Sequence, residues 1–169
     1  MLTTSIGDVA VVRLGLRVPF RRLSVREVLL WRGPLGWAEF APFVEYDDGQ
    51  AVAWLRAMRA AGERTWPAPR RPVVPVNATV PAVPAEQVPA VLALFPGCTT
   101  AKVKVAEADH AEADDLDRLA AVRDVLGSGG RVRIDVNGAW SVDEARRRLP
   151  RYDAAAGGLE YVEQPCATA

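Results

Sequence analysis

The sequence has few of the thiols and imidazoles that build disulfide frameworks and zinc-type metal centres. Its two cysteines, Cys98 and Cys166, lie far apart and match no metal-ligand spacing. Two thiols in a chain of 169 residues do not make a disulfide framework, so a reduced, cytoplasmic environment is expected. The single histidine, His110, argues against a site built on several histidines within this segment.

The sequence also lacks an excess of either charge and any long apolar run. Lys+Arg and Asp+Glu both number 21, and no long basic stretch occurs, so no nucleic-acid partner is expected. No apolar run approaches the ~20 residues that span a membrane, and the N-terminus does not resemble a signal peptide. Attraction to an anionic substrate must therefore come from a local site. The oligomeric state stays open.

The first part of the chain has the pattern of an antiparallel sheet followed by a helix. Turn-forming residues separate the β-rich runs, and helical spacing of apolar residues follows them. The expected elements are strands at 6–17, 24–31 and 37–43, and a helix at 50–61 that ends at Gly62. A proline-rich segment, 65–75, then reads as a linker. We expect two domains, residues 1–66 and 67–169.

The second part alternates between strands and helices. Such alternation is typical of βαβ units and a parallel sheet. The expected strands cover 73–80, 99–105, 132–136 and 159–162, and the expected helices cover 85–95, 111–126 and 142–152. Either a small open α/β sheet or the first half of a (β/α) barrel fits this order. A whole barrel takes about 250 residues, far more than are present here.

Two lysines on one predicted strand form the first candidate site. Side chains alternate along a strand, so Lys102 and Lys104 share one face and Val103 lies on the other. In a barrel, the inward face at the carboxyl end of a strand is where catalytic groups lie. A lysine beside a second cation loses its proton more readily, which suits a general base. A solvent-facing pair on an edge is the alternative interpretation.

Two acids end the next two predicted strands. Asp135 lies two residues before the turn residues Asn137-Gly138, and Glu163 directly precedes Gln164-Pro165. Carboxylate oxygens are the ligands that Mg²⁺ prefers, so two acids at one sheet edge predict a divalent cation site. Such a cation would bind a substrate carboxylate and stabilise an enediolate. Asp135 could instead simply satisfy backbone amides of a turn.

The order of these motifs resembles the muconate-cycloisomerase-like branch of the enolase superfamily. That family carries K-x-K, D-x-N and E-Q-P segments on three consecutive barrel strands, as at 102–104, 135–137 and 163–165. The segment 36–43 is similar to part of its capping domain, and 76–81 and 163–166 look like the actinobacterial o-succinylbenzoate synthases. The resemblance implies an α+β capping domain followed by the first half of an enolase-type α/β (TIM-like) barrel, strands 1–4 with three intervening helices.

The resemblance also implies roles. Lys104 would be the general base, Lys102 would tune it, and Asp135 and Glu163 would bind Mg²⁺ with support from Asn137. The reaction would be a lyase reaction, the syn dehydration of a small carboxylate substrate in menaquinone biosynthesis. Loops at 18–22 and 44–49 would close over the substrate.

Three questions stay open at this point. The same motifs occur in N-acylamino acid racemases and dipeptide epimerases, so dehydration and racemisation are both compatible with them. A third acid and a further lysine, expected on strands five and six, are absent from these 169 residues. The chain by itself is therefore expected to be inactive, and a non-catalytic fragment is the alternative from another class.

Overall fold

A computed structural model describes residues 3–6, 8–20 and 23–167 of the chain. The chain divides into two compact units, Met1–Val73 and Val74–Ala169. Residues 64–77 between the last helix of the first unit and the first strand of the second form neither helix nor strand. The domain boundary predicted between residues 66 and 67 falls inside this segment.

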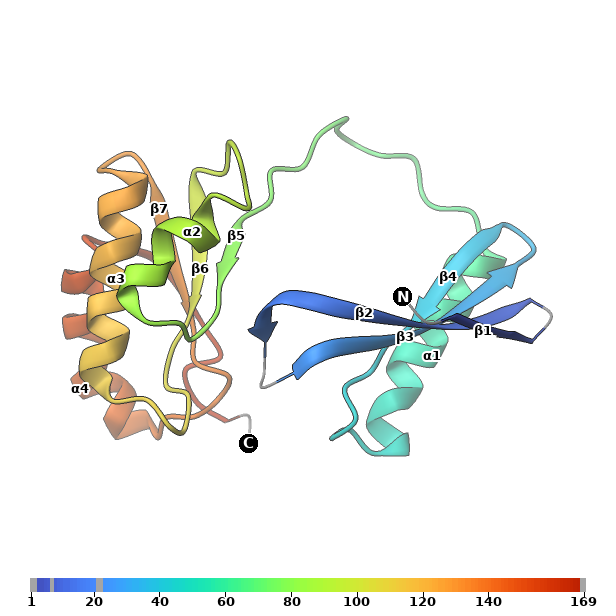
Figure 1. Ribbon diagram of the computed structural model, residues 1–169, viewed down its shortest axis with the longest axis horizontal. Coiled ribbons are helices and arrows are strands. Elements are labelled where there is room, and N and C mark those ends of the chain that lie inside the picture. The colour runs from blue at the N-terminus through green and yellow to red at the C-terminus, as the bar shows by residue number, and fades with distance from the viewer. Residues whose placement is uncertain (1–2, 7, 21–22, 168–169) are drawn as a thin grey trace. The chain divides into compact units, whose positions relative to one another are not determined.

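The first unit is a four-stranded antiparallel sheet with one helix against it (Figure 1). The strands follow chain order, and the elements are β1 (Thr3–Ile6), β2 (Val9–Phe20), β3 (Leu23–Gly33), β4 (Gly36–Phe40) and α1 (Asp48–Glu63). A single strand predicted at 6–17 was wrong, because Ile6 pairs with Val9 across a hairpin. The predicted closing loop at 18–22 is part of β2 as far as Phe20, and Arg21 and Arg22 lie outside the described residues.

Helix α1 begins with a capping box and passes through the glycine that was predicted to stop it. The Asp47 carboxylate accepts a hydrogen bond from the Gln50 amide at 2.7 Å, which satisfies an otherwise unpaired helix N–H group. Gly62 lies inside the helix, where it packs against β3. A Cβ atom there would lie 2.6 Å from the ring of Trp31, so close packing explains the glycine.

The second unit is a four-stranded parallel sheet whose strands also follow chain order, as the alternation predicted. Its elements are β5 (Ala78–Val80), η1 (Ala85–Gln87), α2 (Val88–Leu92), β6 (Thr100–Lys104), α3 (Glu112–Leu126), β7 (Arg131–Asp135), α4 (Val142–Ala155) and β8 (Leu159–Glu163). The strand predicted at 73–80 was too long, because Pro75 cannot donate to a ladder. The helix predicted at 85–95 is a short 3₁₀ turn followed by one short α-helix.

The parallel sheet has one apolar and one polar face. Helices α2, α3 and α4 lie on one side of it in Figure 1. The residues that lie on the helix side are fully buried, among them Val103, Val132 and Ile134. Alternation places Lys102 and Arg133 on the opposite side, away from the helices. The hydrophobic core of this unit therefore lies between the sheet and its helices, and the polar groups occupy the other face.

Three further findings concern only the residues that the structure describes. None of the helices there is long and apolar enough to cross a membrane. Cys98 and Cys166 are free thiols with intermediate exposure. No group of three or more His, Cys, Asp or Glu side chains is arranged to hold a metal ion by itself.

Candidate active site on the polar face of the parallel sheet

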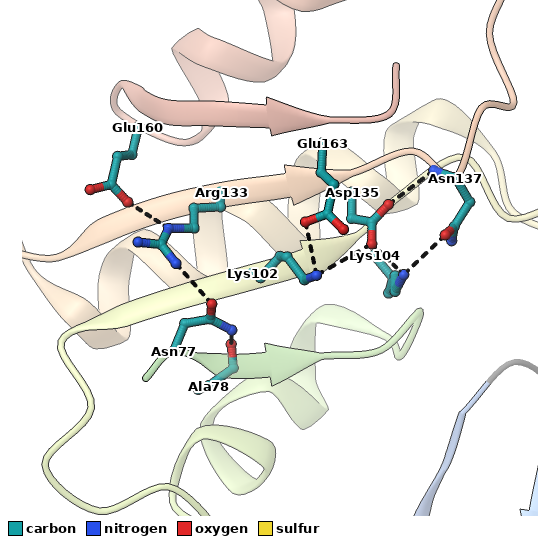
Figure 2. Close-up of polar contacts among 9 residues, drawn as sticks. All are labelled: Asn77, Ala78, Lys102, Lys104, Arg133, Asp135, Asn137, Glu160 and Glu163. Carbon is teal, nitrogen blue, oxygen red and sulfur yellow. Dashed lines mark hydrogen bonds and ion pairs between the residues drawn. The ribbon is translucent and has the colours of Figure 1, made fainter. Parts of the chain in front are cut away.

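The strands β6, β7 and β8 bring the predicted site residues to one edge of the sheet. Parallel pairing places Lys104 beside Asp135, and Asp135 beside Glu163. The carboxyl ends of parallel strands meet at one edge, so these side chains emerge together. Figure 2 shows the amino groups of both lysines directed toward the two carboxylates. The shared face predicted for Lys102 and Lys104 is therefore what the structure has.

The four charged side chains form a continuous set of ion pairs. Lys102 Nζ lies 2.9 Å from Glu163 Oε2 and 3.5 Å from Asp135 Oδ2. Lys104 Nζ lies 2.5 Å from the same Asp135 oxygen. Lys104 and Asp135 are only 5% and 2% exposed, so their charges are largely withdrawn from water. The two lysines are the only two in the whole sequence.

Asn137 supports the buried pair from the loop after β7. Its backbone amide donates to Asp135 Oδ1 at 3.0 Å, and its side-chain oxygen accepts from Lys104 Nζ at 3.2 Å. The residue has φ of 52°, a left-handed conformation that asparagine tolerates better than most residues. Asp135 therefore accepts from the turn through one oxygen and faces the lysines through the other, and its role as a metal ligand stays a prediction.

The ion pairs shift two of the pKa values. Burial disfavours the charged form of Asp135, but Lys104, the Asn137 amide and Lys102 outweigh it and keep the pKa of the carboxyl below its usual value. Burial likewise disfavours the charged form of Lys102, but Glu163 and Asp135 outweigh it and raise its pKa. In this arrangement each carboxylate is therefore matched by an ammonium group.

The chemistry of the donor set suits Mg²⁺. Asp135 and Glu163 provide hard carboxylate oxygens from adjacent strands, and Mg²⁺ usually takes one or two carboxylates plus water and substrate oxygens. A cation held there would share these carboxylates with the two lysines.

A second polar cluster lies deeper on the same face. Arg133 donates to Asn77 Oδ1 at 2.9 Å and to Glu160 Oε2 at 2.5 Å (Figure 2). The β7–β8 register shifts between Val132 and Arg133, so Glu160 has no paired residue on β7 and simple alternation does not place its side chain.

The sequence interpretation missed a buried charged pair on α3. Asp115 and Arg118 are 1% and 0% exposed and lie 2.7 Å apart through Oδ1 and Nη1. The signal was present, because positions 115, 118, 119 and 122 recur at helical spacing and form the buried face of the helix. His110 Nδ1 lies 3.1 Å from Arg118 Nη2, beside this pair.

Both units match known protein domains. The family models described as "Enolase N-terminal domain-like" and "Enolase C-terminal domain-like" match residues 11–62 and 87–169. The chain belongs to the enolase superfamily. The predicted fold class is thereby confirmed, a capping domain with an antiparallel sheet followed by the parallel α/β portion of the barrel domain.

Within this superfamily, the chain is a homologue of o-succinylbenzoate synthases, which are lyases. The o-succinylbenzoate synthase of Thermobifida fusca is 56% identical over 153 residues, which cover 90% of this chain and 47% of that protein. The one from Mycobacterium leprae is 51% identical over 167 residues, which cover 99% and 49%. The chain spans about half the length of the curated relatives it matches.

Solved structures of lower identity share the fold. The o-succinylbenzoate synthase of Thermosynechococcus elongatus, complexed with Mg in the active site, matches with a TM-score of 0.54 at 20% identity, over 95% of this chain and 61% of that one. The L-Ala-D/L-Glu epimerase of Bacillus subtilis matches with 0.65 at 19% identity, over 95% and 60%. Dehydratases and epimerases thus share this architecture, so the fold does not separate the two activities.

Proposed function

We propose that the chain forms the capping domain and the first barrel half of a Mg²⁺-dependent o-succinylbenzoate synthase of menaquinone biosynthesis. The observation that carries the proposal is the pairing of Lys104 Nζ with Asp135 Oδ2 at 2.5 Å, on adjacent strands and at the carboxyl edge of the sheet. Identity of 51–56% to dehydratases favours dehydration over racemisation or epimerisation. A small carboxylate substrate and a cytoplasmic location belong to the same proposal.

The residues suit a syn elimination. Asp135 and Glu163 would hold a divalent cation, which would supply positive charge to the substrate carboxylate as negative charge develops there. Lys104 takes the α-proton as the C–H bond breaks and gives a proton to the departing hydroxyl group, which leaves as water while a C=C bond forms. Lys102, next to the same carboxylates, stabilises the enediolate.

Lys104 can accept a proton only in its neutral form. Its Nζ atom lies 2.5 Å from Asp135 Oδ2. A divalent cation held by Asp135 and Glu163 would compensate part of the negative charge of these carboxylates.

Mg²⁺ binding can be tested with the two lysines as reporters. In a chain labelled with ¹⁵N-lysine, only two side-chain amino signals are expected, from Lys102 and Lys104. Mg²⁺ should shift both signals in the native chain and neither in Asp135→Asn. Shifts of equal size in Asp135→Asn would contradict the assigned ligand set. An Arg59→Met variant serves as a control, because Arg59 forms an exposed ion pair in the first unit.

Activity can be tested in a chimera that completes this chain with the remaining half of the Thermobifida fusca enzyme. The chimera is expected to dehydrate the synthase substrate, and Lys104→Ala should abolish the reaction. Racemisation of N-acylamino acids or epimerisation of dipeptides without dehydration would refute the assignment in favour of the alternative. The 169-residue chain assayed alone tests the expectation that it is inactive.

A further inference from the structure

The buried charges on α3 call for an explanation, because they lie outside the set of ion pairs at the sheet edge. Arg118 and Tyr152 are fully buried, and Asp115 is 1% exposed. Removing an ion pair from water costs several kcal/mol per ion, and an apolar pair of similar size often packs as well.

Arg118 binds backbone carbonyl oxygens near the carboxyl ends of two neighbouring strands, β5 and β6. Its Nη1 donates to the carbonyl oxygen of Lys104 at 3.1 Å and to Asp115 Oδ1 at 2.7 Å. Its Nε donates to the carbonyl oxygen of Val83, in the segment after β5, at 2.5 Å. The guanidinium group therefore links the helix to the end of β6, at the residue that carries the proposed base.

Asp115 binds the backbone on the other side of Val105, at the amide of Ala106. Its Oδ2 accepts hydrogen bonds from the Ala106 amide at 2.8 Å and from the Tyr152 hydroxyl at 2.9 Å. Ala106 has φ of 60°, a conformation that is unfavourable for alanine and persists only where its surroundings impose it. The pair thus fixes the chain on both sides of the point where β6 ends.

We propose that Asp115, Arg118 and Tyr152 are positioning residues that set the direction of the Lys104 side chain. Arg118 reaches the Lys104 carbonyl oxygen and Asp115 reaches the Ala106 amide, so they would act through the backbone of residues 104–106. The inference rests on the proposed role of Lys104 as the base. A displacement of about 1 Å at a reacting group lowers turnover by about 100-fold, so small movements of this strand end matter.

The chain contains a matched control on the same helix. Arg123 also binds carbonyl oxygens, those of Ala156, Gly127 and Gly130, at 2.6–2.8 Å. These groups lie at the opposite end of α3 from Lys104, beside the start of β7. Arg118→Lys and Arg123→Lys each keep the positive charge and lose the planar guanidinium group. The two variants therefore differ in which end of α3 loses its hydrogen bonds to backbone carbonyls.

The accessibility of each lysine amino group can be measured in the 169-residue chain by acylation with an amine-reactive reagent and peptide mass analysis. A change in the direction of the Lys104 side chain should change its acylation rate. Lys104 is 5% exposed, so it should react more slowly than Lys102 in the native chain. Arg118→Lys should raise the Lys104-to-Lys102 rate ratio at least threefold, Tyr152→Phe should raise it less, and Arg123→Lys should leave it unchanged. An unchanged ratio in both Arg118→Lys and Tyr152→Phe would overturn the proposal.

Kinetics of the chimera give the second measurement. Arg118→Lys is expected to lower kcat by about 10- to 100-fold with KM nearly unchanged, and Arg123→Lys should lower thermal stability only. Equal kcat values for the two variants would overturn the positioning role. If the parent chimera shows no dehydration while the acylation ratio still changes, the proposed function fails and the positioning of Lys104 stands. Tyr152→Phe keeps the test valid if Arg118→Lys does not fold.

Discussion

The Lys104–Asp135 pair should show strong energetic coupling, which a double-mutant cycle can measure. The variants are Lys104→Met, Asp135→Asn and the double variant, each compared with the native chain. Methionine keeps most of the lysine stem, and asparagine keeps the shape of aspartate, so the cycle reports mainly on the charges. Lys104→Met leaves Asp135 with Lys102 at 3.5 Å as its ion pair, and Asp135→Asn removes the carboxylate 2.5 Å from Lys104 Nζ.

The expected magnitude follows from distance and burial. The two side chains are 6% and 3% exposed and 2.5 Å apart. Hydrogen bonds to charged groups contribute about 1.5–3 kcal/mol, and contacting residues couple by up to about 3 kcal/mol. We therefore expect a coupling of about 2–3 kcal/mol. Arg13 and Glu27 form a matched exposed pair at 2.9 Å with side chains 52% and 59% exposed, where less than about 1 kcal/mol is expected.

Urea unfolding followed by circular dichroism measures both cycles. With an unfolding slope of about 2 kcal/mol per M, each kcal/mol moves the midpoint by about 0.5 M. The result that refutes the reasoning is additivity within about 0.5 kcal/mol at Lys104–Asp135, or a coupling no larger than that of Arg13–Glu27. Either outcome would mean that water screens the site far more than its burial indicates.

Four further outcomes are expected. Because the pKa of Asp135 is lowered in the folded chain, this carboxylate stabilises the fold at pH values above its unfolded pKa, near 3.8. The contribution is lost as the pH falls through the folded pKa. On acid titration, Asp135→Asn should therefore lose less stability than the native chain. Gly62→Ala should lower the melting temperature, because its Cβ would meet Trp31 at 2.6 Å, whereas Gly15→Ala, with nothing within 4 Å, should pack without a clash. Asp47→Ala should cost about 1 kcal/mol in urea unfolding, because α1 loses its cap, and a loss below about 0.3 kcal/mol would contradict that role.

The parallel unit and its polar edge could be predicted because their signals are local. Alternation along five residues places Lys102 and Lys104 on one face, and the position of an acid at the end of a strand places Asp135 and Glu163 at one edge. Neighbouring parallel strands then bring these ends together whatever the loops do. The catalytic and metal-binding roles of these residues remain predictions.

The features that could not be predicted from the sequence depend on contacts between distant residues. Gly62 reads as a helix stop until the ring of Trp31 is known to lie against it. Glu160 reads as facing away from Arg133 until the register shift between β7 and β8 is known. Asp115 and Arg118 read as ordinary helix charges, although their spacing with Leu119 was a usable signal. In each case the deciding partner, which is Trp31, Arg133 or Tyr152, lies far away in sequence, where simple pattern rules carry little weight.

The two faces of the parallel sheet carry different kinds of side chain: apolar ones that pack against the helices and charged ones that form the candidate site. The apolar layer against the helices contains Val103 and Ile134, while Lys102 and Asp135 project from the opposite face of the same strands. A substitution on the polar face therefore leaves the packed layer intact. Polar side chains around the shared lysines and acids can therefore change while the packed layer maintains the fold. That separation gives a physical reason why one scaffold can host different reactions.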